Sequence, residues 1–360
     1  MGFQRLRFFN FRNLKDAEVG VGAPEVHLVG ENGQGKTNLI EAVHLLCLGS
    51  SFREKHEAFF LRDSDGPMGL NGAYQSDGQG EMTISLLTSP GRKKELRIND
   101  KQIADRRELL ERVLCICFVQ QDMGFIAGAP EERRKFFDQT ISYFDFAFLD
   151  SLRRYRQVLL ARNFCLKSRQ SDLLDTYDEQ LAIFGLEIQK KREALVRLFN
   201  DVFCPLFLEI TGEDQSVEIR YVPSWRQLWS HEEVVSHLGA CRDRDQALGT
   251  TLSGPHRDLF SYLLGGRDYS HFGSTGQLRL CALSLRIAQA RFLTEQSGRR
   301  PVLLLDDVLL ELDQGKKTAI VSRFPAYDQA FFTFLPDEAY SSYATSKTLV
   351  LKVRAGEFSR

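Results

Sequence analysis

The sequence predicts an α/β protein in which one domain is built from both ends of the chain and a helical insert lies between them. Three observations lead to this prediction. Residues 26–48 read as a strand, a glycine-rich loop and a helix in direct succession. Apolar residues then recur at spacings of three and four from residue 148 to residue 202, which is the helical period. After residue 250 strands and helices alternate again. We therefore expect residues 1–130 and 250–360 to form the α/β domain and residues 131–249 the helical insert.

Composition limits the classes of protein that need to be considered. The 360 residues are enough for two domains, and 43% hydrophobic residues can furnish their cores. The sequence has no run of about 18 apolar residues and no secretory leader, so we expect a cytoplasmic protein without membrane contact. A net charge of -1 gives no global attraction to nucleic acid, which would have to bind through local basic patches.

The seven cysteines do not have the spacing of a disulfide framework or a metal site. Cys115 and Cys117 alternate within the apolar segment 113–119, which reads as a strand. We expect these two thiols to be buried structural groups in a reducing compartment.

The first domain begins with a predicted strand at residues 3–11, ahead of the strand at residues 26–29. Residues 64–105 are rich in glycine and aspartate and contain short alternating segments such as 82–87 and 95–98. Such segments are typical of hairpins, so an antiparallel β layer should flank the first sheet.

The middle of the chain predicts two long amphipathic helices, separated by a loop around residues 169–172. They could pair antiparallel as an arm, although packing within a compact helical domain would leave the same apolar stripes. Beyond residue 250 we expect a helix at 277–296, a strand at Val302–Leu305, a helix at 316–324 and a strand at 330–334.

Residues 30–37 fit the pattern G-x-x-x-x-G-K-[ST] between a predicted strand and helix. In this loop backbone N–H groups face phosphates, the lysine reaches the β and γ oxygens, and the hydroxyl group holds Mg²⁺. ATP with Mg²⁺ is therefore the expected cofactor, Thr37 a metal ligand and Lys36 a catalytic residue. The expected nucleotide-binding residues of the loop are Gly30, Glu31, Asn32, Gly33, Gln34, Gly35, Lys36 and Thr37.

A phosphate loop needs a second acidic site, and Asp306 and Asp307 follow directly after the apolar strand Val302–Leu305. Asp306 is the expected second Mg²⁺ ligand, and Asp307 is placed to orient or deprotonate an attacking water. The alternative is a strand that ends on two solvated acids.

The tetrapeptide Ser274-Thr275-Gly276-Gln277 begins a predicted helix. It resembles the signature of ABC ATPases, whose serine and helix N-terminus bind the γ-phosphate held by another subunit. Ser274, Gly276 and Gln277 are then nucleotide-binding residues for a second copy, and the active form is a head-to-tail homodimer around two ATP molecules. A plain helix N-cap is the alternative.

Further matching pieces run through nearly the whole chain, and they make the resemblance specific. They are residues 11–13, 30–38, 51–53, 128–134, 137–138, 252–258, 274–277 and 311–313. With the Gly-Pro-His-Arg-Asp stretch at 254–258 and the signature, the chain resembles the RecF family of bacterial recombination mediators. This resemblance implies an ABC-type (SMC-like) P-loop ATPase head with an antiparallel β layer and an inserted helical arm.

The resemblance also implies a function. The protein would bind DNA without sequence preference, whether single-stranded, gapped or duplex, in recombinational repair and replication. ATP would close a dimer on DNA at gaps or junctions, and slow, DNA-stimulated hydrolysis would release it. RecO and RecR would be partners in the loading of RecA. An SMC-like structural or defence ATPase is the alternative with the same head, and a metabolic P-loop kinase is a third possibility.

Residue roles follow from the same resemblance. Arg12 and Arg53 look like the basic residues that close around the phosphates, and residues 311–313 like the loop that links two heads. Alternatively, Arg12 and Arg53 are ordinary surface arginines, and Asp313 is only a helix N-cap.

The sequence departs from the family pattern at several positions. Gln120 and Gln121 stand where the family usually has a proline followed by an acid, so either glutamine could be the nucleotide-sensing Mg²⁺ ligand of ABC relatives, and Gln121 is the candidate catalytic residue. Leu259 replaces the usual second acid after Asp258, and Thr333 replaces the ABC switch histidine. His256 could act as a substitute base or could be a structural loop histidine.

Basic clusters are the candidates for DNA contact, although most charge runs are solvated faces. They are Arg92, Lys93, Lys94 and Arg97; Arg106, Arg107 and Arg112; Arg133, Arg134 and Lys135; Arg153, Arg154 and Arg156.

Overall fold

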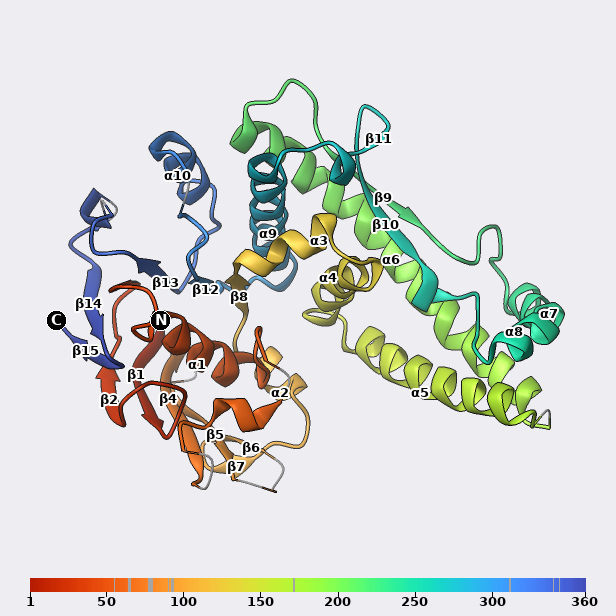
Figure 1. Cartoon of the computed structure of the whole chain (residues 1–360), viewed down its shortest axis with the longest axis horizontal. Coiled ribbons are helices and arrows are strands. Elements are labelled where there is room, and N and C mark those ends of the chain that lie inside the picture. The colour runs from red at the N-terminus through yellow and green to blue at the C-terminus, as the bar shows by residue number, and fades with distance from the viewer. Residues whose placement is uncertain are drawn as a thin grey trace. The chain divides into compact units, whose positions relative to one another are not determined.

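The computed structural model describes residues 1–54, 56–63, 66–76, 80–89, 91, 94–170, 172–310, 312–338, 340–342 and 344–360. The chain forms two compact units, Met1–Gln120 with Gly298–Arg360, and Gln121–Ser297 (Figure 1). Residues 250–297, grouped with the α/β domain in the sequence analysis, belong to the second compact unit. The division into an ATPase head and an insert stays a prediction, because compactness and functional domain are different criteria.

The first unit contains a mixed six-stranded sheet with the order β15-β14-β3-β13-β12-β8. Its strands pair in parallel except for the antiparallel pair at the β15 edge. The strands are β3 (Glu25–Val29), β8 (Cys115–Phe118), β12 (Val302–Leu305), β13 (Gln329–Phe334), β14 (Thr348–Arg354) and β15 (Glu357–Ser359). Every residue of β8, β12 and β13 is buried, as expected for parallel strands covered on both faces.

An antiparallel six-stranded sheet forms the other layer of this unit, with the order β2-β1-β4-β5-β6-β7. Its strands are β1 (Gly2–Phe9), β2 (Ala17–Gly20), β4 (Met68–Ser76), β5 (Gly80–Thr88), β6 (Glu95–Ile98) and β7 (Lys101–Gln102). Met82, Ile84 and Leu86 of β5 are buried, whereas the residues between them are partly exposed. This alternation is typical of a sheet with one packed face, and the antiparallel layer expected from residues 64–105 is confirmed.

Helix α1 (Lys36–Leu48) lies between the two sheets. It contacts β4 and β5 of the antiparallel sheet and β8, β12 and β13 of the mixed sheet. Residues 39–47 are therefore buried all around the helix, and not on one face only. The short helices α2 (Arg107–Leu110) and α10 (Gln314–Val321) complete the helices described in this unit.

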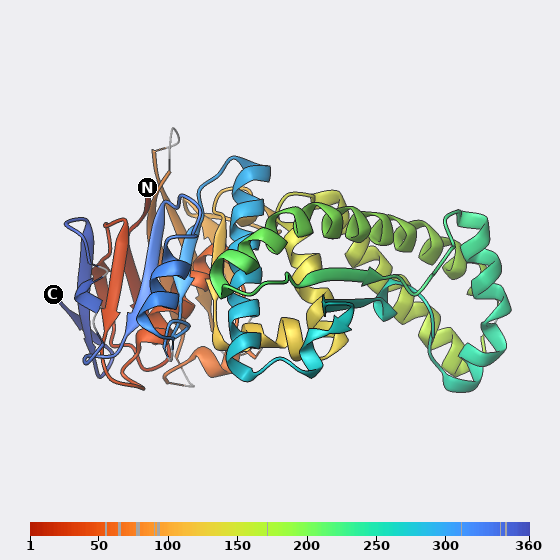
Figure 2. The same ribbon diagram turned by 90° about the horizontal axis from the view of Figure 1, so that it is seen from above.

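The second unit is dominated by α5 (Phe146–Ser168) and α6 (Leu174–Thr211), which run side by side (Figure 2). Lys191 of α6 contacts Asp145, next to the start of α5, whereas Arg162 near the end of α5 contacts Asp178 near the start of α6. The two helices are therefore antiparallel. The remaining α-helices described in this unit are α3 (Gly124–Ala127), α4 (Pro130–Ser142), α7 (His231–Ala240), α8 (Arg242–Leu248) and α9 (Thr275–Ser297).

A small antiparallel sheet, which the sequence analysis did not predict, lies in the second unit. It consists of β9 (Glu218–Val222), β10 (Leu259–Leu264) and β11 (Arg267–Asp268), in the order β11-β10-β9. Phe260 of β10 stacks on Phe137 of α4 with ring centroids 4.1 Å apart, which fixes the sheet to the helices.

The environment of Cys115 and Cys117 agrees with the structural role predicted from the sequence. None of the seven cysteines, all of which are described, forms a disulfide, and both Cys115 and Cys117 are buried in β8. Among the residues described, no group of three or more histidine, cysteine or acidic side chains could hold a metal ion. None of the helices in the described part of the chain is both long and apolar enough to cross a membrane.

Candidate nucleotide site

The phosphate loop connects β3 to α1 and needs glycine at specific positions. Gly33 and Gly35 have φ angles of 75° and 118°, which favour glycine. A Cβ atom at Gly30 would lie 2.3 Å from the carbonyl oxygen of Val353 in β14, so this position has no room for a side chain. The glycines therefore serve both the turn and the packing of the loop on the sheet.

Lys36 is 3% exposed and spans the loop. Its Nζ donates to the carbonyl oxygens of Gly30 at 2.6 Å and Glu31 at 3.0 Å. The ammonium group is thus held over the loop, where the motif uses it to bind phosphate oxygens.

Thr37 and Asp306 meet at the start of α1. The Thr37 hydroxyl group donates to Asp306 Oδ1 at 2.8 Å. Burial raises the pKa of Asp306 to about 6, the hydrogen bond from Thr37 opposes this rise, and the charge of Asp307 adds to it. A hydroxyl and a carboxylate oxygen side by side are the hard oxygen donors that Mg²⁺ prefers, so the residues fit the expected ion.

Asp307 is held by Thr333 of β13. Its backbone N–H donates to Thr333 Oγ1, and the Thr333 hydroxyl group donates to Asp307 Oδ1, both at 2.8 Å. Asp307 has a φ of 53°, which is uncommon for a residue other than glycine. The residue that replaces the expected switch histidine therefore fixes the backbone and the carboxylate of the candidate base.

Arg12 and Arg53 share one partner that the sequence analysis missed, the fully buried carboxylate of Glu41 in α1. Arg12 binds both carboxylate oxygens, at 3.0 and 2.9 Å, and Arg53 Nη2 binds Oε2. An acid between the apolar residues 39–40 and 42–43 was the available signal, because glutamate is almost never fully buried unless it is paired.

The signature residues Ser274–Gln277 lie in the second unit and are exposed. Ser274 N–H donates to Gln277 Oε1 at 2.9 Å, and Gln277 N–H donates to Ser274 Oγ at 3.3 Å. This reciprocal pair caps α9, so the N-cap reading holds. The exposure leaves Ser274, Gly276 and Gln277 accessible to a second chain.

Gln120 and Gln121 are both exposed, at the start of a 3₁₀ turn (Gln120–Met123). Gln120 ends the first unit and Gln121 begins the second. The role of Gln121 as a nucleotide-sensing residue therefore stays a prediction from the sequence.

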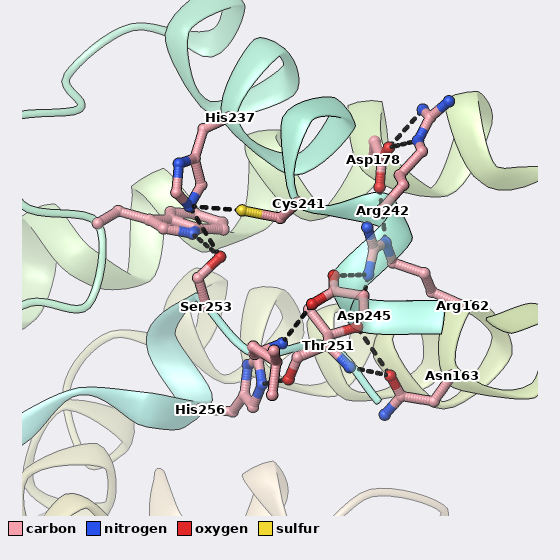
Figure 3. Close-up of polar contacts among 12 residues, drawn as sticks. Arg162, Asn163, Asp178, His237, Cys241, Arg242, Asp245, Thr251, Ser253 and His256 are labelled. Atoms are coloured by element: carbon pink, nitrogen blue, oxygen red, sulfur yellow. Dashed lines mark hydrogen bonds and ion pairs between the residues drawn. The ribbon is translucent and has the colours of Figure 1, made fainter. Parts of the chain in front are cut away.

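The Gly-Pro-His-Arg-Asp stretch is bound into the second unit (Figure 3). His256 Nδ1 lies 2.7 Å from the Tyr155 hydroxyl group, and its Nε2 lies 3.0 Å from the Thr251 carbonyl oxygen. Burial lowers the pKa of His256 to about 4. With both ring nitrogens engaged, His256 is better explained as a structural residue than as a base.

The basic clusters considered for DNA contact differ in whether their side chains already bind other groups of the protein. Arg133 and Arg134 donate to the carbonyl oxygens of Phe260 and Asp258, at 3.0 and 2.8 Å, and so stabilise β10. Arg92 and Lys93 lie outside the described residues, as does Glu311 of the expected head-linking loop. Asp313 caps α10 by accepting from Lys316 N–H at 2.9 Å.

Comparison with known proteins agrees with this architecture. The family model described as the RecF/RecN/SMC N terminal domain matches residues 3–349. The DNA replication and repair protein RecF of Treponema pallidum (strain Nichols) is 39% identical over 347 residues, covering 96% of this chain and 98% of the relative. The RecF protein of Leptospira interrogans serogroup Icterohaemorrhagiae serovar Lai (strain 56601) is 32% identical over 346 residues, covering 95% and 94%.

Solved structures of known proteins also resemble this chain in fold. A structure described as the recombination mediator protein RecF-ATP in the RecFOR pathway has a TM-score of 0.89 at 28% identity, covering 99% of this chain and 97% of that one. An Smc head bound to the C-winged helix domain of ScpA shares the fold alone, with a TM-score of 0.59 at 14% identity, covering 99% and 95%. The fold and the phosphate loop thus define an ATPase head of the SMC class. Within this class, the chain belongs to the RecF family.

Proposed function

We propose that this chain is an ATP-dependent DNA-binding protein of recombinational repair and replication in the cytoplasm. The observation that carries the proposal is the contact between Thr37 and Asp306, which joins the phosphate loop to the acidic residues that would complete this chain's half of a Mg²⁺–ATP site. Lys36 binds the phosphates, Thr37 and Asp306 hold Mg²⁺, and Asp307 orients or deprotonates the attacking water. The bound ion supplies charge neutralisation at the β and γ oxygens.

The second half of the site comes from another copy of the chain. Ser274 and the start of α9 are exposed, as a helix N-terminus must be to bind a γ-phosphate presented by a partner. ATP then closes a head-to-tail dimer on DNA at gaps or junctions, and slow hydrolysis reopens it. RecR and RecO act with the dimer in loading RecA, in keeping with the pathway named for the RecF structures.

Two variants test the shared site when they are measured separately and mixed. Lys36→Arg should abolish hydrolysis, and Ser274→Arg should abolish ATP-induced dimerisation in light scattering. A mixed dimer has one site in which the intact Lys36 of one chain faces the intact Ser274 of the other. Mixing should therefore restore part of the ATPase rate. Full hydrolysis by a monomeric Ser274→Arg protein would refute the shared site.

DNA binding is tested by gel shift on gapped, single-stranded and duplex DNA, with ATP and without nucleotide. We expect ATP-dependent binding that weakens as salt increases, because phosphate contacts release counterions. Failure to bind any of the three DNAs in either state would remove the repair function.

A further inference from the structure

Glu41 is a buried acid whose partners all come from segments outside its helix. Its side chain is fully buried, and its oxygens accept from Arg12, from Arg53 and, at 2.5 Å, from Ser51 Oγ. Although burial raises the pKa of Glu41, the hydrogen bonds from Arg12, Arg53 and Ser51 together lower it below its ordinary value. Glu41 is therefore an ionised carboxylate in the core of the first unit.

Arg12 precedes α1 in the sequence and Arg53 follows it, and the side chains of both contact Glu41. Arg12 follows β1 and has a φ of 52°, and its Nη1 also donates to the Phe59 carbonyl oxygen at 2.6 Å. Arg53 comes from the loop after α1. Their side chains remain 19% and 29% exposed, so each guanidinium group keeps N–H donors that Glu41 does not use.

A chain of hydrogen bonds connects Glu41 to the phosphate loop. Arg53 Nη2 donates to Asn38 Oδ1 at 2.6 Å, and Asn38 Nδ2 donates to Asn13 Oδ1 at 2.6 Å. Asn13 Nδ2 then donates to the carbonyl oxygen of Gly33 at 2.8 Å. The carboxylate, both arginine-bearing segments and the loop thus form one network.

We propose that Glu41 is a positioning residue of the phosphate site, which holds Arg12 and Arg53 beside the loop before ATP arrives. This inference rests on the proposed ATP binding. Two guanidinium groups and one carboxylate leave one surplus positive charge next to an anionic ligand. Side chains fixed in advance lose little conformational entropy when they bind that ligand, and this raises affinity.

Glu41→Gln in the full chain tests the inference through the equilibrium affinity for ATP. We expect a loss of roughly tenfold, the lower end of what removing an orienting partner costs at metal sites. The matched control is Glu18→Gln, which removes a carboxylate that is 53% exposed and pairs with Arg5. Wild-type affinity in Glu41→Gln would overturn the inference alone. Failure of the unmodified chain to bind ATP would instead overturn the proposed function.

A double-mutant cycle separates positioning from general folding. If Glu41 acts through the arginines, Glu41→Gln should have no further effect on ATP affinity in an Arg12→Ala/Arg53→Ala background. An equal loss in both backgrounds would overturn the inference. Should Glu41→Gln fail to fold, Glu41→Asp keeps the charge but has a side chain one methylene shorter. This variant should also weaken ATP binding, and unchanged affinity would count against the inference.

Discussion

The Thr37 hydroxyl group and the Asp306 carboxylate, 269 positions apart in the sequence, share a hydrogen bond of 2.8 Å. Thr37 lies in the first turn of α1, which follows β3 and the phosphate loop, and Asp306 follows β12 of the same mixed sheet. The sheet therefore brings together the two oxygen groups proposed to hold Mg²⁺, which neither local segment could supply alone.

Thr37→Val should remove the dependence of ATP affinity on Mg²⁺, because valine has nearly the shape of threonine but no oxygen. Thr37→Ser, which keeps the hydroxyl group, is the control. ATP binding measured with Mg²⁺ and with a chelator gives the readout. We expect hydrolysis to fall at least about tenfold in the valine variant, since the metal stabilises charge in the transition state. An unchanged response to Mg²⁺ would exclude Thr37 as a ligand.

Thr333→Val should lower kcat by roughly tenfold and leave ATP affinity unchanged, since a positioned general base contributes about 10²- to 10⁴-fold and Thr333 only orients it. Thr333→Ser preserves both hydrogen bonds to Asp307 and should keep the wild-type rate. Steady-state ATPase assays with separate measurement of nucleotide affinity distinguish the two effects. If kcat of the valine variant matched the wild type, Asp307 would not depend on Thr333.

His27→Phe should reduce the sensitivity of the protein to acid. His27 is 1% exposed and lies beside the rings of Phe332 and Phe334, and burial lowers its pKa to about 4. The folded protein therefore favours neutral His27. Its contribution to stability is complete above pH 6.5 and is lost as the pH falls from 6.5 towards 4.

The loss from His27 is at most about 3 kcal/mol, from a pKa difference of about 2.5. Melting temperatures at pH 7.5 and 5.0 should differ less in His27→Phe than in the wild type. His56→Phe, at an exposed position, should leave the difference unchanged. A phenylalanine variant as acid-sensitive as the wild type would show that other groups control this transition.

Arg162→Met should destabilise the second unit by about 3–5 kcal/mol, because it leaves a buried charge without its partner. Arg162 binds Asp178 at 2.6 Å and Asp245 at 2.7 Å, and all three side chains are fully buried (Figure 3). Asp178 keeps Arg242 as a partner, whereas Asp245 loses its cation.

Urea unfolding followed by tryptophan fluorescence measures this change, since both tryptophans, Trp225 and Trp229, lie in the second unit. Arg242→Met is the control, because the Arg242 side chain is 30% exposed and Asp178 would retain Arg162. Arg242→Met should lower the free energy of unfolding by about 1 kcal/mol, the amount typical of a partly exposed ion pair. Equal losses in the two variants would contradict the role assigned to burial.

The sequence was sufficient for those parts of the site that depend on local patterns. A strand, a glycine-rich loop and a helix are adjacent in the chain, and two acids after an apolar strand are equally local. The contact between Thr37 and Asp306 could then be inferred, since the carboxyl ends of parallel strands meet at one edge of a sheet.

The partner of the two arginines could not be predicted in this way. Sheets cover α1 on both sides, so a buried charge such as Glu41 leaves no periodic signal in the sequence. The strands of the second unit were missed because β9 has only five residues and β11 two. The pairing of β9 with β10 joins residues about 40 positions apart, beyond the range of local propensity.

The position of β3 has a consequence for how the protein is made. This strand, which carries the phosphate loop, pairs with β13 and β14, and Gly30 packs against Val353. The strands on either side of β3 lie about 300 positions later in the sequence, so the ribosome makes them long after the loop. The proposed nucleotide site therefore cannot be complete until the ribosome has made β14, however early the loop itself is released.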